Sequence, residues 1–130
     1  MRVVFDTNIF ISAFVVPGSQ AEKAVINIIE SQDTLVISKD ITGEVLSVLS
    51  SKFSRDREAI SRTAVNLSEL AEVVYPRKKI HVLQDEPDNR ILECAVSGKA
   101  DVIVTGDREM LKLKKYQGVK IISLKEYLET

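Results

Sequence analysis

The sequence predicts an α/β protein: a three-layer α/β/α sandwich around a central, mainly parallel sheet, formed by a single domain over residues 1–130. Short apolar segments rich in β-branched residues alternate with longer segments of helical periodicity, the pattern of a parallel sheet with helical crossovers. The segment DVIVT at 101–105 is apolar on both faces, as in a strand that helices cover on both sides. A length of 130 residues suits one domain, and no repeat or linker divides it.

Local signals predict the elements along the chain. Strands are expected at short β-branched runs, and helices where apolar residues recur every three or four positions. Ser19, with a glutamate three residues later, and Ser38 are expected to cap helices. Pro76 ends one long helix, and Gly98 ends the helix after it. In order, the expected elements are strand 2–5, helix 9–14, helix 19–30, strand 34–37, helix 39–49, helix 57–74, helix 86–97, strand 101–105, helix 108–113, strand 119–122 and helix 123–129.

The composition is that of an ordinary globular protein, with 45% hydrophobic and 28% charged residues. No apolar run approaches the roughly 18 residues that span a membrane, and the N-terminus carries no secretion signal. The one cysteine, Cys94, has no partner for an internal disulfide. We therefore expect a cytoplasmic protein without a membrane partner. The net charge of −1 does not by itself indicate nucleic-acid binding.

Asp6 lies in an otherwise apolar stretch, VVFDTNIFISAF at 3–14. An unpaired buried carboxylate is costly, so Asp6 must cap a helix, pair with a cation, or bind a metal ion. Asp107 follows the strand 101–105 after one glycine, as Asp6 follows the strand 2–5 directly. Ligands of parallel sheets bind at the carboxyl ends of the strands, so both acids are expected at one sheet edge.

Two further acids, Glu44 and Asp88, fall on the apolar stripes of their helices. Each acid has a simple alternative explanation. Asp6, Asp88 and Asp107 lie where acids favour helix N-termini, and Glu44 at the border of its stripe would pair with a lysine. Four acids from four elements are better explained together, by a shared hard cation such as Mg²⁺ or Mn²⁺. Zinc is not indicated, because the single histidine has no second nitrogen or sulfur ligand nearby.

The sequence resembles the PIN-domain family in four stretches that occur in family order and span nearly the whole chain. They are VVFDTNIFISA, ISKDITGEVLSVL, DEPDNRILECAVSGKADVIVTGD and VKIISLKEYL. The chain most resembles the small prokaryotic members known as VapC-type toxin ribonucleases. The resemblance implies an α/β/α sandwich and a Mg²⁺- or Mn²⁺-dependent endoribonuclease. It further implies an RNA substrate, a cognate antitoxin protein as partner and a homodimer, with helices 19–30 and 57–74 offering apolar edges.

The resemblance also assigns roles to individual residues. Metal binding and catalysis fall to four acids, Asp6, Glu44, Asp88 and Asp107. Supporting positions are Asn8, Thr105 and Ser38. Relatives carry aspartate at the positions of Asn89 and Glu109, so these two residues and the nearby Asp85 stay outside the expected ligand set. The basic runs PRKK at 76–79 and KLKKY at 112–116 are expected to contact phosphates beside the acidic site.

Three alternatives remain at the level of sequence. A haloacid-dehalogenase-like phosphatase also places Asp after its first strand and uses Mg²⁺, but it needs a second Asp where this chain has Asn8. A receiver domain that binds Mg²⁺ without being an enzyme needs an acidic pair after the first strand and an acceptor Asp after a middle one, where this chain has Ser38. A nuclease fold kept only as a partner-binding domain is disfavoured by the intact acids.

Overall fold

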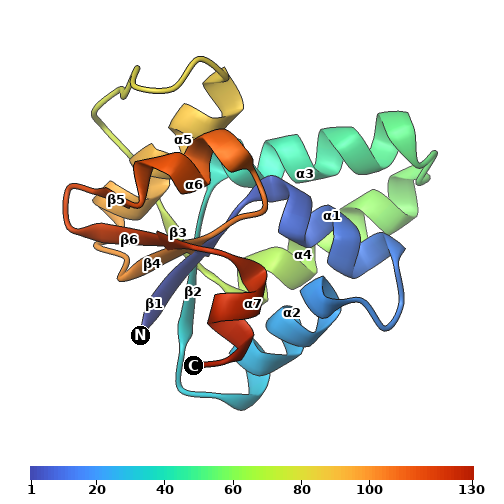
Figure 1. Cartoon of the computed structure of the whole chain (residues 1–130). Helices are drawn as coiled ribbons and strands as arrows, with labels where there is room; N and C mark the ends of the chain where they lie inside the picture. Colours follow the sequence, from blue (N-terminus) through green and yellow to red (C-terminus); the bar gives the residue numbers. More distant parts are fainter.

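The computed structural model describes residues 1–130, and its centre is a six-stranded sheet (Figure 1). The strand order is β3-β2-β1-β4-β6-β5. All neighbouring strands are parallel except the β5–β6 pair, which is antiparallel. The strands are β1 (Arg2–Phe5), β2 (Thr34–Ser38), β3 (Glu72–Val74), β4 (Val102–Val104), β5 (Lys115–Tyr116) and β6 (Val119–Ile122). The α/β fold class predicted from the sequence is confirmed.

Helices cover both faces of the sheet and complete the three layers (Figure 1). They are α1 (Thr7–Val15), α2 (Gln20–Glu30), α3 (Lys39–Lys52), α4 (Arg57–Leu70), α5 (Glu86–Ser97), α6 (Arg108–Leu113) and α7 (Leu124–Leu128). The helices α1 to α4 lie on one face, whereas α5 and α6 lie on the other, as right-handed crossovers between these strands require. Helix α7 follows the last strand and packs against α2 on the first of these faces. Ser19 and Ser38 cap α2 and α3 with their hydroxyl oxygens, as the sequence predicts.

The predicted helix 57–74 is wrong in its last turn. Helix α4 ends at Leu70, and Glu72–Val74 form the edge strand β3, which pairs in parallel with β2. Helical periodicity continues through Ala71, but the next two apolar residues are both valine, which favours a strand when a neighbouring edge is open. The edge of β2 supplies that pairing from a distant part of the sequence.

The short strand β5 was not expected either. It forms a hairpin with β6 through Gln117 and Gly118, whose φ angles are 47° and 86°. Positive φ at both central residues is typical of the tight turn that joins two antiparallel strands. The hairpin closes the sheet on the side away from β3.

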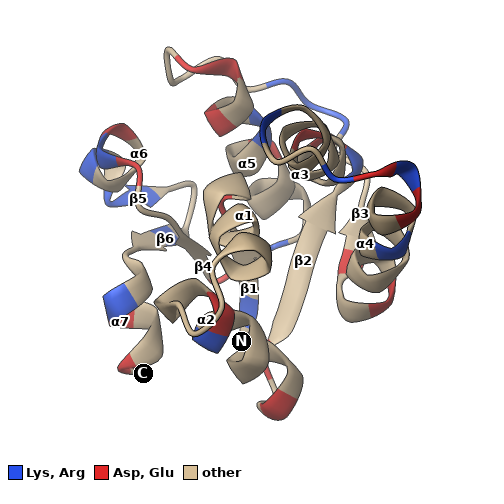
Figure 2. Ribbon diagram, turned by 90° about the vertical axis from the view of Figure 1, so that its right-hand side faces the viewer, with Lys and Arg blue, Asp and Glu red and all other residues tan.

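The core lies between the sheet and its two helix layers and includes all of β6 except Lys120, together with the centres of β1, β2 and β4. No single helix is long and apolar enough to cross a membrane, and α1 and α2 reach that length only as a pair bent by 101°. The parallel strands β3, β2, β1 and β4 all end at the same edge of the sheet, as the arrowheads in Figure 2 show for β2 and β3. This carboxyl edge carries the residues considered next.

Candidate functional site

Asp6 is buried at the carboxyl end of β1, with 3% of its surface exposed. One carboxylate oxygen accepts the backbone N–H of Asn8 at 3.2 Å, so Asp6 caps α1. The other oxygen accepts the hydroxyl of Thr105 at 2.6 Å. Burial raises the pKa of Asp6 most, and the charges of Asp107 and Asp85 raise it further, against the two hydrogen bonds that lower it.

Thr105 joins two of the acids. Its hydroxyl donates to Asp6 and accepts the backbone N–H of Asp107 at 3.0 Å. Asp107 in turn caps α6, because its Oδ1 accepts the N–H of Met110 at 3.0 Å. One hydroxyl at the end of β4 therefore fixes the carboxylate after β1 relative to the turn that carries the next acid.

Asp88 lies in the first turn of α5 and is 7% exposed. Burial raises its pKa to about 7, with further contributions from the charges of Asp107, Asp6 and Asp85. The charges of Asp85 and Asp107 therefore raise the pKa of both Asp6 and Asp88, which places all four carboxyl groups within range of electrostatic repulsion. We call Asp6, Asp85, Asp88 and Asp107 the acidic cluster.

The acidic cluster faces a cavity of about 390 Å³, which we call the acidic pocket. Three of the four acids line it, Asp85, Asp88 and Asp107, and Glu109 joins them. The loop 82–84 that leads into α5 also lines the pocket. Asp85 begins α5 but makes no capping hydrogen bond with its side chain, so its carboxylate is available to the pocket.

Glu44 lies outside the acidic cluster. It is half-buried on α3 and lines a neighbouring cavity of about 250 Å³, together with Thr7 and Arg90. It is not among the charges that raise the pKa of Asp6 or Asp88. Thr7 follows Asp6 directly, so this second cavity approaches the cluster from the α3 side.

The supporting residues expected from the sequence differ in their contacts. Thr105 holds Asp6 as described above, whereas Asn8 contacts Asp6 through its backbone and exposes its side chain. Ser38 is fully buried, where its hydroxyl accepts the N–H of Ile41 at 3.2 Å and lies against Cys94. Its observed role is to begin α3.

Two buried polar residues of α5 did not enter the expected site. Asn89 is 0% exposed and Glu93 is 3% exposed, and both bind the loop before the helix. Glu93 carries the same signal that singled out Asp6, a charge between apolar neighbours in ILECAV. Sequence reasoning set Asn89 aside because it is not an acid, but its position beside the apolar stripe indicated burial.

The acidic cluster fits a hard divalent cation by the chemistry of its donors, which are all carboxylate oxygens. The like charges that raise the pKa of Asp6 and Asp88 repel each other less when a cation lies between them. As the side chains stand, no three Asp, Glu, His or Cys groups are arranged to hold one ion. Binding therefore requires carboxylates to turn toward a common point.

Known proteins share the sequence pattern and the fold of this chain. An uncharacterized protein of Methanocaldococcus jannaschii is 30% identical over 132 residues, covering 96% of this chain and 84% of that protein. The structure of VapBC-1 from nontypeable Haemophilus influenzae superposes with a TM-score of 0.68 at 20% identity, covering 96% and 99% of the two chains. The structure of VapBC2 from Rickettsia felis, bound to a promoter DNA fragment, superposes with a TM-score of 0.67 at 17% identity. The match covers 95% of this chain and 98% of that chain. The PIN domain family matches residues 2–109, and the chain therefore belongs to the PIN domain family.

Proposed function

We propose that this chain is a divalent-metal-dependent endoribonuclease that hydrolyses RNA phosphodiesters with Mg²⁺ or Mn²⁺ at the carboxyl edge of the sheet. The observation that carries the proposal is the acidic cluster: carboxylates from separate elements gather beside an open cavity, where the charges of Asp85 and Asp107 raise the pKa of Asp6 and Asp88. Membership of the PIN domain family supports the nuclease assignment. Fold similarity to VapBC structures supports a role as the toxin of a toxin–antitoxin pair, with an antitoxin protein as partner. We propose that this pair acts in the cytoplasm.

We assign metal binding to Asp6, Asp88 and Asp107, with Glu44 approaching from the neighbouring cavity. A carboxylate offers about four lone-pair positions, and Asp6 uses two for Asn8 and Thr105, so the others remain for a cation. A bound Mg²⁺ would generate a hydroxide nucleophile from water and stabilise the charge that develops on the phosphate. The residues of the chain orient that ion: Thr105 fixes the Asp6 carboxylate, and helix capping fixes Asp107.

The test is cleavage of labelled single-stranded RNA by the purified chain with Mg²⁺, with Mn²⁺ and with EDTA. Asp107→Asn keeps an oxygen that can cap α6 but removes the charge, so the variant should stay folded and lose cleavage by orders of magnitude. Glu69→Gln, an exposed change on α4, is the matched control and should cleave like the wild type. Equal cleavage by wild type and Asp107→Asn, or by wild type in EDTA, contradicts the proposal. Hydrolysis of p-nitrophenyl phosphate without RNA cleavage would favour the phosphatase alternative.

We also propose a homodimer, because α2 and α4 each expose an apolar side chain. Ile29 is 64% exposed and Val65 is 53% exposed. Light scattering of the wild type should report twice the monomer mass of 14.5 kDa. The variant Val65→Lys should give a lower mass, because it places a charge in the proposed interface. A monomer at all accessible concentrations contradicts the dimer and leaves the nuclease proposal untouched.

A further inference from the structure

A third cavity lies between the segment that follows β3 and the last turns of α5. Its volume is about 250 Å³. Tyr75, Arg77 and Lys78 form one side, whereas Ile80 and Val96 contribute apolar surface. We call this cavity the Tyr75 groove. No residue of it belongs to the acidic cluster.

The Tyr75 groove and the acidic pocket are close. Tyr75 directly follows β3, and β3 is separated from β1 only by β2, so Tyr75 and Asp6 leave the same sheet edge about 10 Å apart at ~4.8 Å per strand. Along α5, Val96 lies eight residues after Asp88, about 12 Å at 1.5 Å per residue. At ~3.4 Å per stacked nucleotide, about three or four nucleotides of a single strand bridge this distance.

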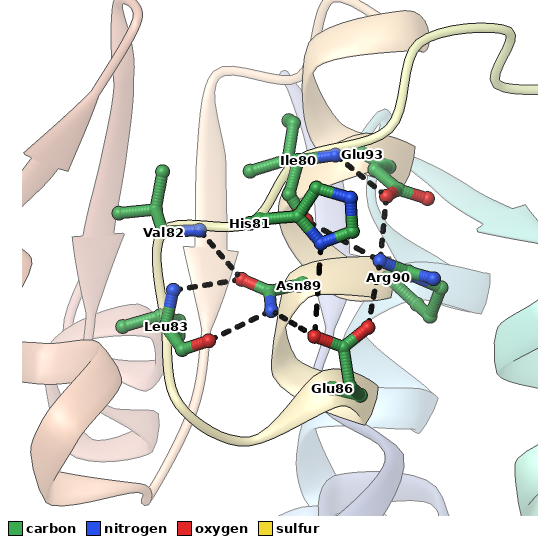
Figure 3. A network of polar contacts seen from close by, with 8 residues as sticks. All are labelled: Ile80, His81, Val82, Leu83, Glu86, Asn89, Arg90 and Glu93. Atoms are coloured by element: carbon green, nitrogen blue, oxygen red, sulfur yellow. Dashed lines mark hydrogen bonds and ion pairs between the residues drawn. The ribbon is translucent and has the colours of Figure 1, made fainter.

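One loop forms a wall of both cavities. Ile80 lines the Tyr75 groove, and Val82 and Leu83 line the acidic pocket. The buried side chain of Asn89 accepts the N–H groups of Val82 and Leu83 at 3.2 and 2.8 Å and donates to the Leu83 carbonyl at 2.8 Å (Figure 3). The loop between the two cavities is therefore held to α5 through its backbone.

The same loop is fixed at its other end by a buried ion pair. Glu93 accepts the N–H of Ile80 at 2.9 Å and pairs with Arg90 at 2.9 Å (Figure 3). Arg90 also reaches Glu86 at 3.3 Å, at the start of α5. Arg90 offsets part of the negative charge of Glu93, which also lines the groove, so the repulsion of an anion there is reduced.

The charge distribution favours an anionic ligand in the Tyr75 groove. The segment that leads into α5 passes from basic to acidic, visible as blue followed by red in Figure 2. Arg77, Lys78 and Lys79 are exposed, and none of them makes an ion pair. The acidic pocket itself repels phosphates, so the affinity for a polyanion has to come from neighbouring cations.

Tyr75 supplies the second element of a nucleotide site. It is 73% exposed, the highest fraction among the large apolar and aromatic residues that the fold leaves at the surface. An exposed aromatic ring beside basic side chains is the combination that binds single-stranded nucleic acid, by stacking on a base while cations contact the backbone. The chain contains few other aromatic residues, and the rings of Phe5, Phe10 and Tyr127 are in the core.

We propose that the Tyr75 groove binds a nucleotide of single-stranded RNA a few positions from the scissile phosphate, with Tyr75 stacked on the base and Arg77 and Lys78 on the phosphates. The assignment rests on the proposed ribonuclease function and adds the place where the substrate is held outside the acidic pocket. The loop fixed by Asn89 and Glu93 sets the distance between the two cavities.

The test measures RNA binding separately from cleavage. Fluorescence anisotropy with a short labelled single-stranded RNA in EDTA reports affinity without turnover. Tyr75→Ala should bind about 5- to 150-fold more weakly, the equivalent of ~1–3 kcal/mol for one stacked base. Tyr75→Phe keeps the ring and should bind like the wild type. Because Tyr75 is exposed, both variants should melt like the wild type.

The cations are tested through salt dependence. The double variant Arg77→Ala and Lys78→Ala should reduce the slope of log K against log salt by about 1.4, at ~0.7 per phosphate contact on a single strand. The control, Lys23→Ala with Lys120→Ala, removes two exposed charges from α2 and β6 and should leave the slope near that of the wild type. In turnover assays with Mg²⁺, Tyr75→Ala should raise KM and leave kcat near the wild-type value.

The outcomes separate the two proposals. Unchanged affinity in Tyr75→Ala and in the double variant, with cleavage by the wild type, overturns the groove and leaves the nuclease standing. Binding that depends on Tyr75, without cleavage by the wild type under any divalent ion, supports the groove and overturns the nuclease. Wild-type protein that binds no RNA at low salt overturns the groove.

Discussion

The change Asp88→Asn tests whether charge repulsion and burial within the acidic cluster destabilise the folded, metal-free protein. The two side chains have nearly the same shape, so the substitution removes a negative charge and little packing. In the metal-free protein, burial and the charges of Asp107, Asp6 and Asp85 raise the pKa of Asp88 from 3.8 to about 7. A raised pKa means that the folded state binds the proton more tightly than the unfolded state. Stability contributed by the protonated group is present below pH 4 and is lost as the pH rises to 7.

The size of this loss follows from the pKa. A change from 3.8 to about 7 corresponds to at most ~4 kcal/mol, at about 1.4 kcal/mol for each pH unit. Solvent screening of the neighbouring charges lowers the expected value to about 2 kcal/mol. For a chain of this size, 1 kcal/mol shifts Tm by roughly 3–5 °C. At pH 8 in EDTA, Asp88→Asn should therefore melt about 6–10 °C above the wild type.

The assay is thermal melting by circular dichroism in EDTA at pH 4.5, 6 and 8. The difference in Tm between Asp88→Asn and the wild type should shrink toward zero at pH 4.5, because the wild-type carboxyl is protonated in the folded state at that pH. Glu69→Gln removes an exposed carboxylate on α4 and should follow the wild type at each pH. Added Mg²⁺ should stabilise the wild type by mass action and the Asp88 variant much less. An Asp88→Asn protein that is less stable than the wild type by the same amount at all three pH values would refute the reasoning.

Two further changes test a hydrogen bond within the site and the packing of α5 on the sheet. Thr105→Val keeps the shape but leaves a buried carboxylate oxygen without its donor, so urea unfolding should show a loss of about 1.5–3 kcal/mol, which Thr105→Ser should largely avoid. Gly98→Ala should destabilise the fold by about 1–3 kcal/mol, because its Cβ would lie 2.5 Å from Cγ1 of Val36. In the double variant Gly98→Ala with Val36→Ala, the loss of stability should be smaller than the sum of the two single losses. Full additivity would show that the two residues do not compete for space.

Most of the fold was predictable because the local sequence signals indicate the same helices and strands that the sheet topology requires. Ser19, Ser38 and Gly98 mark helix boundaries where the structure has them. The failure at Glu72–Val74 has a different cause. A three-residue strand contains too few positions to show alternation, and its stability comes from pairing with β2, which local sequence does not report. The hairpin at Gln117–Gly118 was readable from its turn residues and was missed.

The site was predictable in its acids but not in their grouping. Asp6 and Asp88 interrupt apolar patterns, and Asp107 follows a strand as Asp6 does, so strand order brings Asp6 and Asp107 to one edge. The separation of Glu44 from the cluster depends on how α3 is rotated over the sheet, which helical periodicity leaves open. The inclusion of Asp85 depends on a missing capping bond, which only side-chain geometry reveals.

Helix capping and metal binding are compatible explanations for the same acids. In a parallel sheet, each strand ends where a helix begins, so capping residues gather at the carboxyl edge. Asp6 caps α1 and Asp107 caps α6 through one oxygen each. A cap holds its carboxylate at a fixed position, and that restraint lowers the entropy lost when a cation is bound. Capping alone does not account for the cluster, because Asp88 is buried without a capping role and Asp85 begins α5 without a side-chain bond. The four charges are brought together beyond what the helices need, and the shared cation proposed above would give that proximity a function.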